Sequence, residues 1–294
     1  MRVAVLGANG QLGEDVTAAF LAQGDEVTPL THEDVEVTSL DSVRQSLENA
    51  RPELVINTAA FHNVDRCEDE PARAFAVNAI GARNIAQVTD LLSAKLVHIS
   101  TDYVFDGAKP TPYTEQDQPR PLNVYGNSKL SGEYFVRSIN SRHFVVRVSA
   151  IYGENPCRAK QGLNFVELML KTARERDEVR VVDDQRVTPT PTVEIARQLA
   201  LLGKTSHYGL YHASAEGSCT WYEFARTIFD LTGTSVRLER PRPGEYPAKA
   251  NRPKNSVLEN AGLKEISLNA FTHWKNGLEN YLARRKQATA AARA

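Results

Sequence analysis

Near its start the sequence reads Arg2-Val3-Ala4-Val5-Leu6 and continues directly into Gly7-Ala8-Asn9-Gly10-Gln11-Leu12-Gly13. The first stretch is short and mostly apolar, which predicts a strand buried in a parallel sheet. Residues 11–23 then carry apolar side chains at helical spacing, and Gly24 ends the pattern. A strand, a GxxGxxG loop and a helix in this order predict a dinucleotide-binding unit.

Each glycine of this loop has a physical reason to be there. Gly7 permits the tight turn after the strand, and Gly10 lets the backbone approach a pyrophosphate. Gly13 permits close packing of the helix on the strand. The free N–H groups and the positive dipole at the start of the helix favour phosphate binding. The alternative is a turn with a purely structural role.

The remaining pattern predicts an α/β fold with a doubly wound, parallel, Rossmann-like sheet. Short β-rich runs alternate with helical runs, which is typical of βαβ units with right-handed crossovers. Further strands are expected at residues 26–30, 54–57, 96–100 and 144–148, and helices at 71–92 and 121–138.

The pattern changes after residue 150, where helical segments alternate with brief strands. We expect a dinucleotide-binding domain over residues 1–155 and a smaller α/β substrate-binding domain over 156–285, with the chain crossing between them. The polar, alanine-rich residues 286–294 are expected to form a flexible tail. In the second part, helices are expected at 164–176, 193–202 and 220–231, strands at 179–182 and 209–212, and a proline-rich loop at 241–253.

Composition excludes several classes of protein. With 294 residues, 41% of them apolar and 24% charged, the chain has the make-up of a folded globular protein. A net charge of −1 offers no field for nucleic acid, and no apolar run approaches the roughly 20 residues of a membrane span. Three dispersed cysteines, seven histidines without ligand spacing and no signal peptide pattern predict no disulfide framework, no metal site and a cytoplasmic location. The cysteines are Cys67, Cys157 and Cys219.

One pair of side chains is suited to proton transfer. Tyr125 and Lys129 stand four residues apart in a predicted helix and therefore share a face. A tyrosine with a pKa of about 10 needs help at neutral pH, which a lysine one turn away provides. Ser100-Thr101 ends a predicted strand, where ligands of open α/β sheets bind, so a hydroxyl there can bond a substrate carbonyl or the Tyr125 oxygen. The alternative is a surface aromatic and a solvated lysine.

The residues after the second predicted strand leave the choice of dinucleotide open. An acid at the end of this strand is the usual partner of the ribose 2′-OH in NAD-binding proteins. Here the strand ends in Leu30-Thr31-His32, Glu33 and Asp34 come slightly later, and no arginine stands nearby for a 2′-phosphate. NADPH and NADH are both expected as cofactors, with a preference of less than about 30-fold, or roughly 2 kcal/mol.

These motifs resemble the dTDP-4-dehydrorhamnose reductase family of extended short-chain dehydrogenase/reductases, and the similarity runs over residues 1–282. Two runs, STDYVFDG at 100–107 and RPKNS at 252–256, are fairly specific to that branch. Other matching stretches are 7–13, NTAAFHNVD at 57–65, 77–78, 125–129 with Gly132-Glu133, 164–165, 181–185, 188–190, 211–212 and 221–225.

The resemblance implies reduction of a 4-keto group on a nucleotide-linked 6-deoxyhexose with NADPH or NADH. Tyr125 is then the proton donor, Lys129 its partner and a ribose ligand, and Thr101 a substrate-bonding hydroxyl. The implied cofactor-binding residues are Gly7, Asn9, Gly10, Gln11, Leu12, Gly13, Glu36, Val37, Ala59, Ala60, Tyr125 and Lys129. The implied substrate-binding residues are Thr101, Asp102, His62, Ala150, Gln185 and Arg252.

Some of these residues also have a structural interpretation. His62 is either a substrate contact or a hydrogen-bonded structural residue, whereas Arg252 is well suited to a diphosphate. Asn78 is expected to brace the backbone near the site. Trp221 stands at helical spacing with Phe224 and is expected in the core.

The chain departs from the family pattern at one position. Members commonly read Arg-Thr-Ser-Trp-x-Tyr-Gly after the fifth strand, whereas residues 147–153 here read RVSAIYG, with Ala150 in place of the tryptophan. An aromatic ring supplies a rigid wall for a sugar. Ala150 therefore predicts a wider hexose pocket unless Phe61 or Tyr103 fills the space.

Two other functions are compatible with these motifs. One is a non-catalytic, NADP-binding regulatory subunit resembling the β subunit of methionine adenosyltransferase, although Thr101, Tyr125 and Lys129 favour an enzyme. The other is an NAD-dependent sugar-nucleotide epimerase, which would keep its cofactor bound. A homodimer is compatible with the sequence, which does not decide the oligomeric state.

Overall fold

The chain folds around a six-stranded parallel sheet in the computed structural model, which describes residues 1–156, 162–242, 245 and 249–291. The strand order is β10-β5-β4-β3-β1-β2, so the direction of winding reverses between β1 and β3. The predicted doubly wound α/β fold is confirmed. The strands are β1 (Arg2–Leu6), β2 (Glu26–Leu30), β3 (Leu54–Asn57), β4 (Lys95–Thr101), β5 (His143–Val148) and β10 (Gly209–His212).

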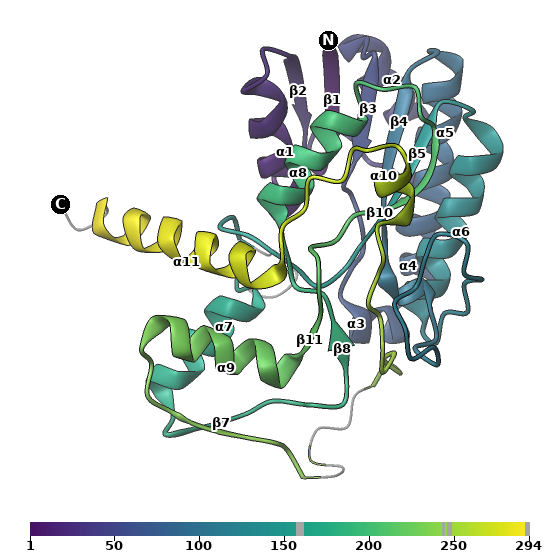
Figure 1. Ribbon diagram of the computed structural model, residues 1–294. Helices are drawn as coiled ribbons and strands as arrows, with labels where there is room; N and C mark the ends of the chain where they lie inside the picture. Colours follow the sequence, from purple (N-terminus) through teal and green to yellow (C-terminus); the bar gives the residue numbers. More distant parts are fainter. Residues whose placement is uncertain (157–161, 243–244, 246–248, 292–294) are drawn as a thin grey trace.

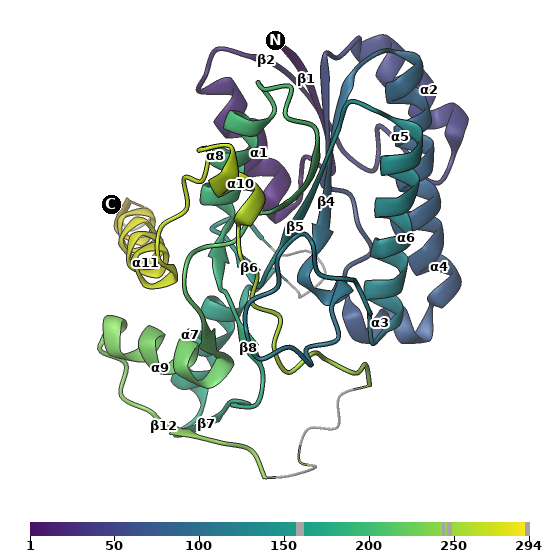
Figure 2. The same cartoon turned by 45° about the vertical axis from the view of Figure 1, so that its right-hand side comes forward.

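Helices cover both faces of the sheet (Figure 2). One face packs against α1 (Gln11–Leu21), α8 (Thr192–Leu202) and α10 (Ala261–Glu265) in a core that includes Phe20 and Leu199. The other face packs against α2 (Leu40–Ala50), α5 (Ala82–Leu91) and α6 (Val124–Ile139), with Leu47, Ile85 and Val136 fully buried. Because both faces are covered, the inner strands β1 and β3 are mostly apolar and buried, as the sequence predicted for β1, whereas the edge strand β2 is partly exposed.

The helix predicted over residues 71–92 is interrupted near the site. It consists of α4 (Pro71–Phe75), the π-helix η1 (Ala76–Gly81) and α5, and a short helix α3 (Val64–Asp69) precedes it. A π-turn inserts an extra residue into the helical ladder and often occurs at functional sites. Here it carries Asn78, which is almost fully buried.

The smaller part of the molecule lies below the carboxyl ends of the strands (Figure 1). Its core contains Val166, Phe224, Leu278 and Tyr281. Three short ladders, β6-β9, β7-β12 and β8-β11, accompany its helices. Its elements are β6 (Ile151–Tyr152), α7 (Phe165–Glu175), β7 (Glu178–Arg180), β8 (Arg186–Val187), β9 (Thr190–Pro191), β11 (Cys219–Thr220), α9 (Trp221–Thr232), β12 (Arg237–Glu239) and α11 (Trp274–Ala291).

Two elements from the second half of the sequence join the first part. Strand β10 pairs in parallel with β5, and α8 packs against α1. The boundaries at residues 155 and 285 stay predictions. Helix α11 includes residues 286–291 of the expected tail, whose flexibility is also still a prediction, and residues 292–294 lie outside the described residues.

Candidate active site

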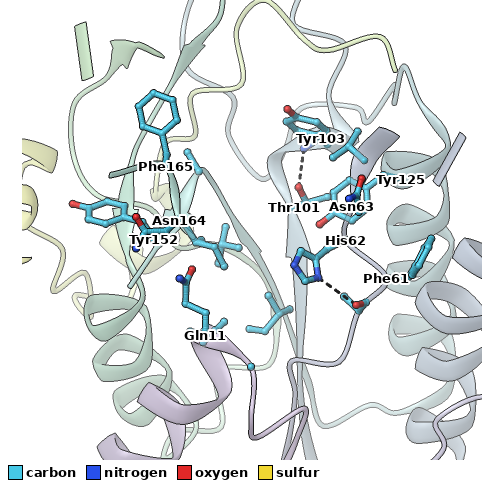
Figure 3. A pocket seen from close by; sticks show the side chains of 18 of the residues that line it. Gln11, Phe61, His62, Asn63, Thr101, Tyr103, Tyr125, Tyr152, Asn164 and Phe165 are labelled. Carbon is cyan, nitrogen blue, oxygen red and sulfur yellow. Dashed lines mark hydrogen bonds between the residues drawn. The ribbon is translucent and has the colours of Figure 1, made fainter. Parts of the chain in front are cut away.

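A cavity of about 1570 Å³ opens at the carboxyl ends of the parallel strands. It extends from the loop after β1 to helices α7 and α9 of the smaller part. Figure 3 shows its two walls, with Gln11, Asn164 and Phe165 opposite Thr101 and Tyr125. Ligands of open α/β sheets bind at this edge, beside the point where the strand order reverses.

The glycine loop after β1 leaves space for a ligand. Gly7 has a φ of +75°, and a Cβ there would lie 2.8 Å from Thr58 Oγ1. A Cβ on Gly13 would lie 2.2 Å from the Gly7 carbonyl oxygen, so only glycine fits at both positions. A Cβ on Gly10 would meet only that same oxygen, at 3.2 Å. The open side of Gly10 is therefore where another molecule can approach the backbone.

The start of α1 offers N–H groups to this space. Gly10 is the N-cap of the helix and brings no side chain to cap its first turn. Uncapped N–H groups and the helix dipole favour an anion such as a pyrophosphate. Asn9, Gln11 and Leu12 line the cavity together with the glycines. This geometry fits a dinucleotide, and the assignment of each residue as a ligand stays a prediction.

The side chain of Gln11 has a second task that the sequence does not reveal. Its Nε2 donates to the carbonyl oxygen of Asn155 at 2.9 Å and to that of Gly153 at 3.4 Å. Asn155 in turn donates to Asp15 of α1 at 3.2 Å. The side chain of Gln11 thus ties α1 to the chain after β6, which leaves its backbone N–H for a phosphate.

The residues after β2 line the part of the cavity where the sequence predicts the adenosine of the cofactor. Glu36 and Val37 line it beside Thr31 and His32. The Glu36 carboxylate accepts hydrogen bonds from the backbone N–H and the hydroxyl of Thr38, at 2.9 and 2.8 Å. The backbone bond is the main cause that lowers the pKa of Glu36, so its carboxylate is charged at neutral pH.

Arg73 lines the same region, although no motif in the sequence pointed to it. It lies in α4, donates to Glu70 at 3.0 Å, and places its guanidinium 5.0 Å from the ring centre of Phe61. Its charge also contributes to the lowered pKa of Glu36. Arg73 supplies the positive charge for a 2′-phosphate that the segment after β2 lacks, and Glu36 supplies an acid for a ribose hydroxyl. Both NADPH and NADH are therefore compatible with this part of the cavity.

Asn78 braces the segment after β3. Its side-chain amide accepts from the Phe61 N–H at 2.8 Å and donates to the Phe61 carbonyl at 2.9 Å. It also donates to the Ser128 hydroxyl of α6 at 3.0 Å. This contact links the segment containing Ala59 and Ala60, which line the cavity, to the helix that carries Tyr125 and Lys129.

Thr101 and Tyr125 meet at the floor of the cavity. Thr101 ends β4, and Tyr125 lies in the first turn of α6. The Thr101 hydroxyl donates to Asp102 Oδ1 at 3.0 Å and accepts from the Tyr103 N–H at 3.1 Å. The Tyr125 side chain lies beside Thr101 (Figure 3), and Thr101 acts to lower the pKa of Tyr125.

The environment of Tyr125 keeps its hydroxyl protonated. Burial raises the pKa of Tyr125 well above its usual value, and the charge of Asp102 raises it further. Thr101 acts to lower the pKa of Tyr125, but this effect is smaller than that of burial. Tyr125 is therefore suited to donate a proton.

Lys129 is buried on the same face of α6. Its ammonium donates to the Ile99 carbonyl at 2.6 Å. Burial lowers the pKa of Lys129 to about 8, against the attraction of Glu133. Lys129 is thus mostly charged at neutral pH, as a partner for a tyrosine oxygen must be.

The neighbouring hydroxyl of Ser100 serves a different partner. It donates to the buried carboxylate of Glu133. The same carboxylate accepts two bonds from Arg147, at 2.9 and 2.7 Å. Successive side chains of a strand point to opposite faces. Ser100 therefore supports a buried ion pair, and Thr101 is the hydroxyl that lies beside Tyr125.

Asp102 lies behind Thr101 with both carboxylate oxygens engaged. One accepts from Thr101, and the other accepts from the Ser149 hydroxyl at 2.8 Å. Burial raises the pKa of Asp102 to about 6, although these hydrogen bonds act to lower it. Asp102 lines the cavity, but its oxygens already have partners within the protein.

The other predicted substrate residues also line the cavity. His62 lies with Thr101 and Tyr125 (Figure 3), and Ala150 and Gln185 are among the further lining residues. Ala150 has a φ of +44° and brings no ring into the cavity. Arg252 also lines the cavity, and its Nη2 lies 2.8 Å from an Asp65 carboxylate oxygen. Their roles as substrate ligands stay predictions.

Trp221 lies partly outside its predicted place in the core. Its ring packs against Phe165 with 4.6 Å between ring centres, and it lines the cavity. The helical spacing with Phe224 does place it on the buried face of α9. Trp221 is the first residue of that helix, however, and this position brings it to the cavity wall.

Metal ligands and membrane spans were sought in the described part of the chain. Among those residues, no group of three or more His, Cys, Asp or Glu side chains could hold a metal ion. No helix among them is long and apolar enough to cross a membrane. Cys67 and Cys219 are buried free thiols, and Cys157 lies outside the described residues.

Comparison with known proteins decides the family. A family model described as the RmlD substrate binding domain matches residues 1–287. The chain belongs to this family. It is 39% identical over 288 residues to the spore coat polysaccharide biosynthesis protein SpsK of Bacillus subtilis, which covers 98% of this chain and 99% of the relative.

Relatives within this family carry the names expected from the sequence. A dTDP-4-dehydrorhamnose reductase of Sinorhizobium fredii is 37% identical and covers 88% of both chains. The crystal structure of a dTDP-4-dehydrorhamnose reductase from Bacillus anthracis in complex with NADP is 38% identical, with a TM-score of 0.92 over 96% of this chain and 99% of that one. The predicted resemblance is confirmed.

Proposed function

We propose that this chain reduces the 4-keto group of a dTDP-linked 6-deoxyhexose, with NADPH or NADH as the hydride donor. One observation carries the proposal: Tyr125, one helical turn from Lys129 and beside Thr101, lines the cavity between the glycine loop and the smaller part of the molecule. The relatives named dTDP-4-dehydrorhamnose reductase, one of them bound to NADP, support the same reaction.

The dinucleotide fits the first part of the cavity. The open side of Gly10 and the uncapped start of α1 face its pyrophosphate, and Glu36 and Val37 face its adenosine. When bound, the reduced nicotinamide supplies a hydride to C4 of the sugar. Lys129 is buried beside this path, where its ammonium is able to bond a ribose hydroxyl.

Tyr125 supplies the proton that balances the hydride. Negative charge develops on the 4-oxygen of the sugar, and the Tyr125 hydroxyl transfers its proton to that oxygen. The Lys129 ammonium stabilises the phenolate that remains. Thr101 lies beside Tyr125, and its hydroxyl is held by Asp102 and by the Tyr103 N–H, which keeps it in place for the 4-oxygen of the sugar.

The sugar nucleotide fits between the strand ends and the smaller part. Gln185 and Arg252 provide polar contacts, while Phe165 and Trp221 provide an aromatic wall. Ala150 leaves the hexose end wide, so the preferred sugar is bulkier than 4-dehydrorhamnose, or activity on that sugar is weak. Installing a ring with Ala150→Trp tests this point. A low-micromolar KM for dTDP-4-dehydrorhamnose that Ala150→Trp does not improve contradicts it.

The division of labour follows from this placement. Residues 1–155 hold the dinucleotide and 156–285 hold most of the sugar nucleotide. The reaction needs no nucleic acid, and a net charge of −1 does not attract nucleic acid to the protein.

The buried free thiols of Cys67 and Cys219 suit a reducing cytoplasm. A homodimer is the assembly to test, by light scattering of the purified protein.

The direct experiment follows oxidation of NADPH and NADH by the purified protein with a panel of dTDP- and UDP-linked 4-keto-6-deoxyhexoses. Turnover with a dTDP-linked sugar, and its loss in Tyr125→Phe, are the expected results. A protein that binds NADP and turns over none of the panel is a regulatory subunit instead. A protein that keeps NAD through purification and interconverts two sugar epimers is an epimerase.

A further inference from the structure

A segment from late in the chain crosses back onto the helix that carries Tyr125. Residues 249–252 lie against both ends of α3 and the start of α6 through side-chain and backbone contacts. Farther on, a Cβ at Gly107 would lie 2.6 Å from the Lys254 N–H nitrogen, so the segment also packs closely on the loop after β4. These contacts place Arg252 in the cavity wall.

Asp65 holds the guanidinium of Arg252 directly. One carboxylate oxygen accepts from Arg252 Nη2 at 2.8 Å, and the other accepts from the Ala250 N–H at 3.2 Å. The Arg252 side chain keeps about a quarter of its surface exposed, at 26%. A guanidinium has more N–H donors than this contact uses, so the remaining donors are available to a ligand.

Asn123 holds the backbone next to Arg252. As the N-cap of α6, its Oδ1 accepts from the Gly126 N–H at 2.8 Å. Its Nδ2 donates to the Asn251 carbonyl, also at 2.8 Å. Asp, Ser and Thr cap helices about as well as Asn, but a side-chain amide also donates to a carbonyl oxygen. The choice of Asn therefore serves the second contact.

We propose that Asp65 and Asn123 are positioning residues that hold Arg252 in place for the diphosphate of the sugar nucleotide. The proposal rests on the proposed function, because that function supplies the diphosphate. Asp65 fixes the guanidinium, and Asn123 fixes the Asn251 carbonyl one residue earlier. Helix α6 therefore carries Tyr125 and, through its N-cap Asn123, also fixes the position of Arg252.

The physical benefit is preorganisation. A long side chain that is already held in one geometry loses less rotational freedom when a ligand binds. Planar guanidinium groups bind phosphate oxygens through paired hydrogen bonds, which require a fixed orientation. The Asp65 carboxylate also offsets part of the positive charge of Arg252 and could compete with the diphosphate for the guanidinium. If Asp65 positions Arg252, removing its charge lowers the affinity for the diphosphate. If Asp65 competes, removing its charge raises that affinity.

The test compares the binding of thymidine diphosphate and of thymidine to the protein loaded with NADP. The diphosphate preference is the ratio of the two dissociation constants, and it isolates contacts to the phosphates. Arg252→Ala is expected to lower this preference strongly. Asp65→Asn and Asn123→Asp are each expected to lower it by about tenfold, the scale of one lost hydrogen bond to a charged group, with thymidine binding unchanged.

Two controls match these variants. Asp69 lies in α3, as Asp65 does, and Asp69→Asn removes its ion pair with Lys249. Neither Asp69 nor Lys249 lines the cavity, so the diphosphate preference of this variant is expected to stay the same. Asn123→Asp keeps an acceptor for the cap of α6, but its buried carboxylate faces the Asn251 carbonyl oxygen, so its melting temperature is expected to fall and its binding is measured below that temperature. Asn123→Ser gives a second cap without the amide donor.

Several results overturn the inference. A higher diphosphate preference in Asp65→Asn shows that Asp65 competes with the ligand instead of positioning its partner. An unchanged preference in Arg252→Ala, in a protein that still reduces its sugar, shows that the diphosphate binds elsewhere while the proposed function stands. Equal binding of thymidine and thymidine diphosphate by the unmodified protein, together with no turnover, removes the proposed function itself.

Discussion

The buried carboxyl of Asp102 makes a testable contribution to the pH dependence of stability. Only 4% of its surface is exposed, and burial raises its pKa from 3.8 to about 6. The folded protein therefore holds the Asp102 proton more tightly than the unfolded chain does. Stability is favoured while the carboxyl is protonated, declines as the pH rises from about 4 to about 6, and stays at the lower level above that range.

The magnitude follows from the size of the shift. A difference of roughly two pKa units corresponds to about 3 kcal/mol of stability at full ionisation. Part of this effect is already present at about pH 4.5, since the unfolded carboxyl is then partly ionised. Between about pH 4.5 and about pH 7.5, Asp102 is expected to lower the free energy of unfolding by about 2 kcal/mol.

The assay compares the protein with Asp102→Asn, whose amide has nearly the same shape and does not titrate. Free energies of unfolding are measured by urea titration at about pH 4.5 and about pH 7.5. The variant is expected to gain about 2 kcal/mol relative to the original protein on going to the higher pH. Other titrating groups are common to both proteins and cancel in the difference. If the difference in the free energy of unfolding between the protein and Asp102→Asn is equal at both pH values, the reasoning is refuted.

Three further results are expected. Tyr125→Phe retains cofactor binding but lowers turnover by about 10²-fold or more, the scale of losing a general acid, and near-normal turnover contradicts its role. Gly10→Val weakens NADPH binding in a folded protein, because its side chain occupies the open side of the loop; an unchanged fluorescence titration makes that loop structural. Loss of the Lys129 proton lowers kcat/KM as the pH rises through about 8, whereas a flat profile to about pH 9.5 rules this out.

The sequence predicted the parts of the site that depend on local geometry. The loop from Gly7 to Gly13 follows a strand and begins a helix, so its conformation depends on residues close in the chain. Tyr125 and Lys129 are one helical turn apart, which places both on one face without any knowledge of the tertiary fold. Both features appear in the cavity wall where they were expected.

Other features depend on contacts between distant segments and left no local pattern. Strand β10 completes the sheet beside β5, although 60 residues separate β5 from it in the chain, and its four residues carry no sign of that partner. Arg73 lines the predicted adenosine end only because α4 packs there. The local pattern did not decide between Ser100 and Thr101, because that depends on where Glu133 lies, and only the family resemblance pointed to Thr101.

The backbone at Ala150 bears on the proposed width of the hexose end. A non-glycine residue at a φ of +44° costs roughly 1–2 kcal/mol, and a larger side chain at this position bears the same strain. Ala150 also lines the cavity, so a larger side chain there would take up part of its space. We therefore propose that the small residue leaves that space to the substrate, and the comparison with Ala150→Trp tests it.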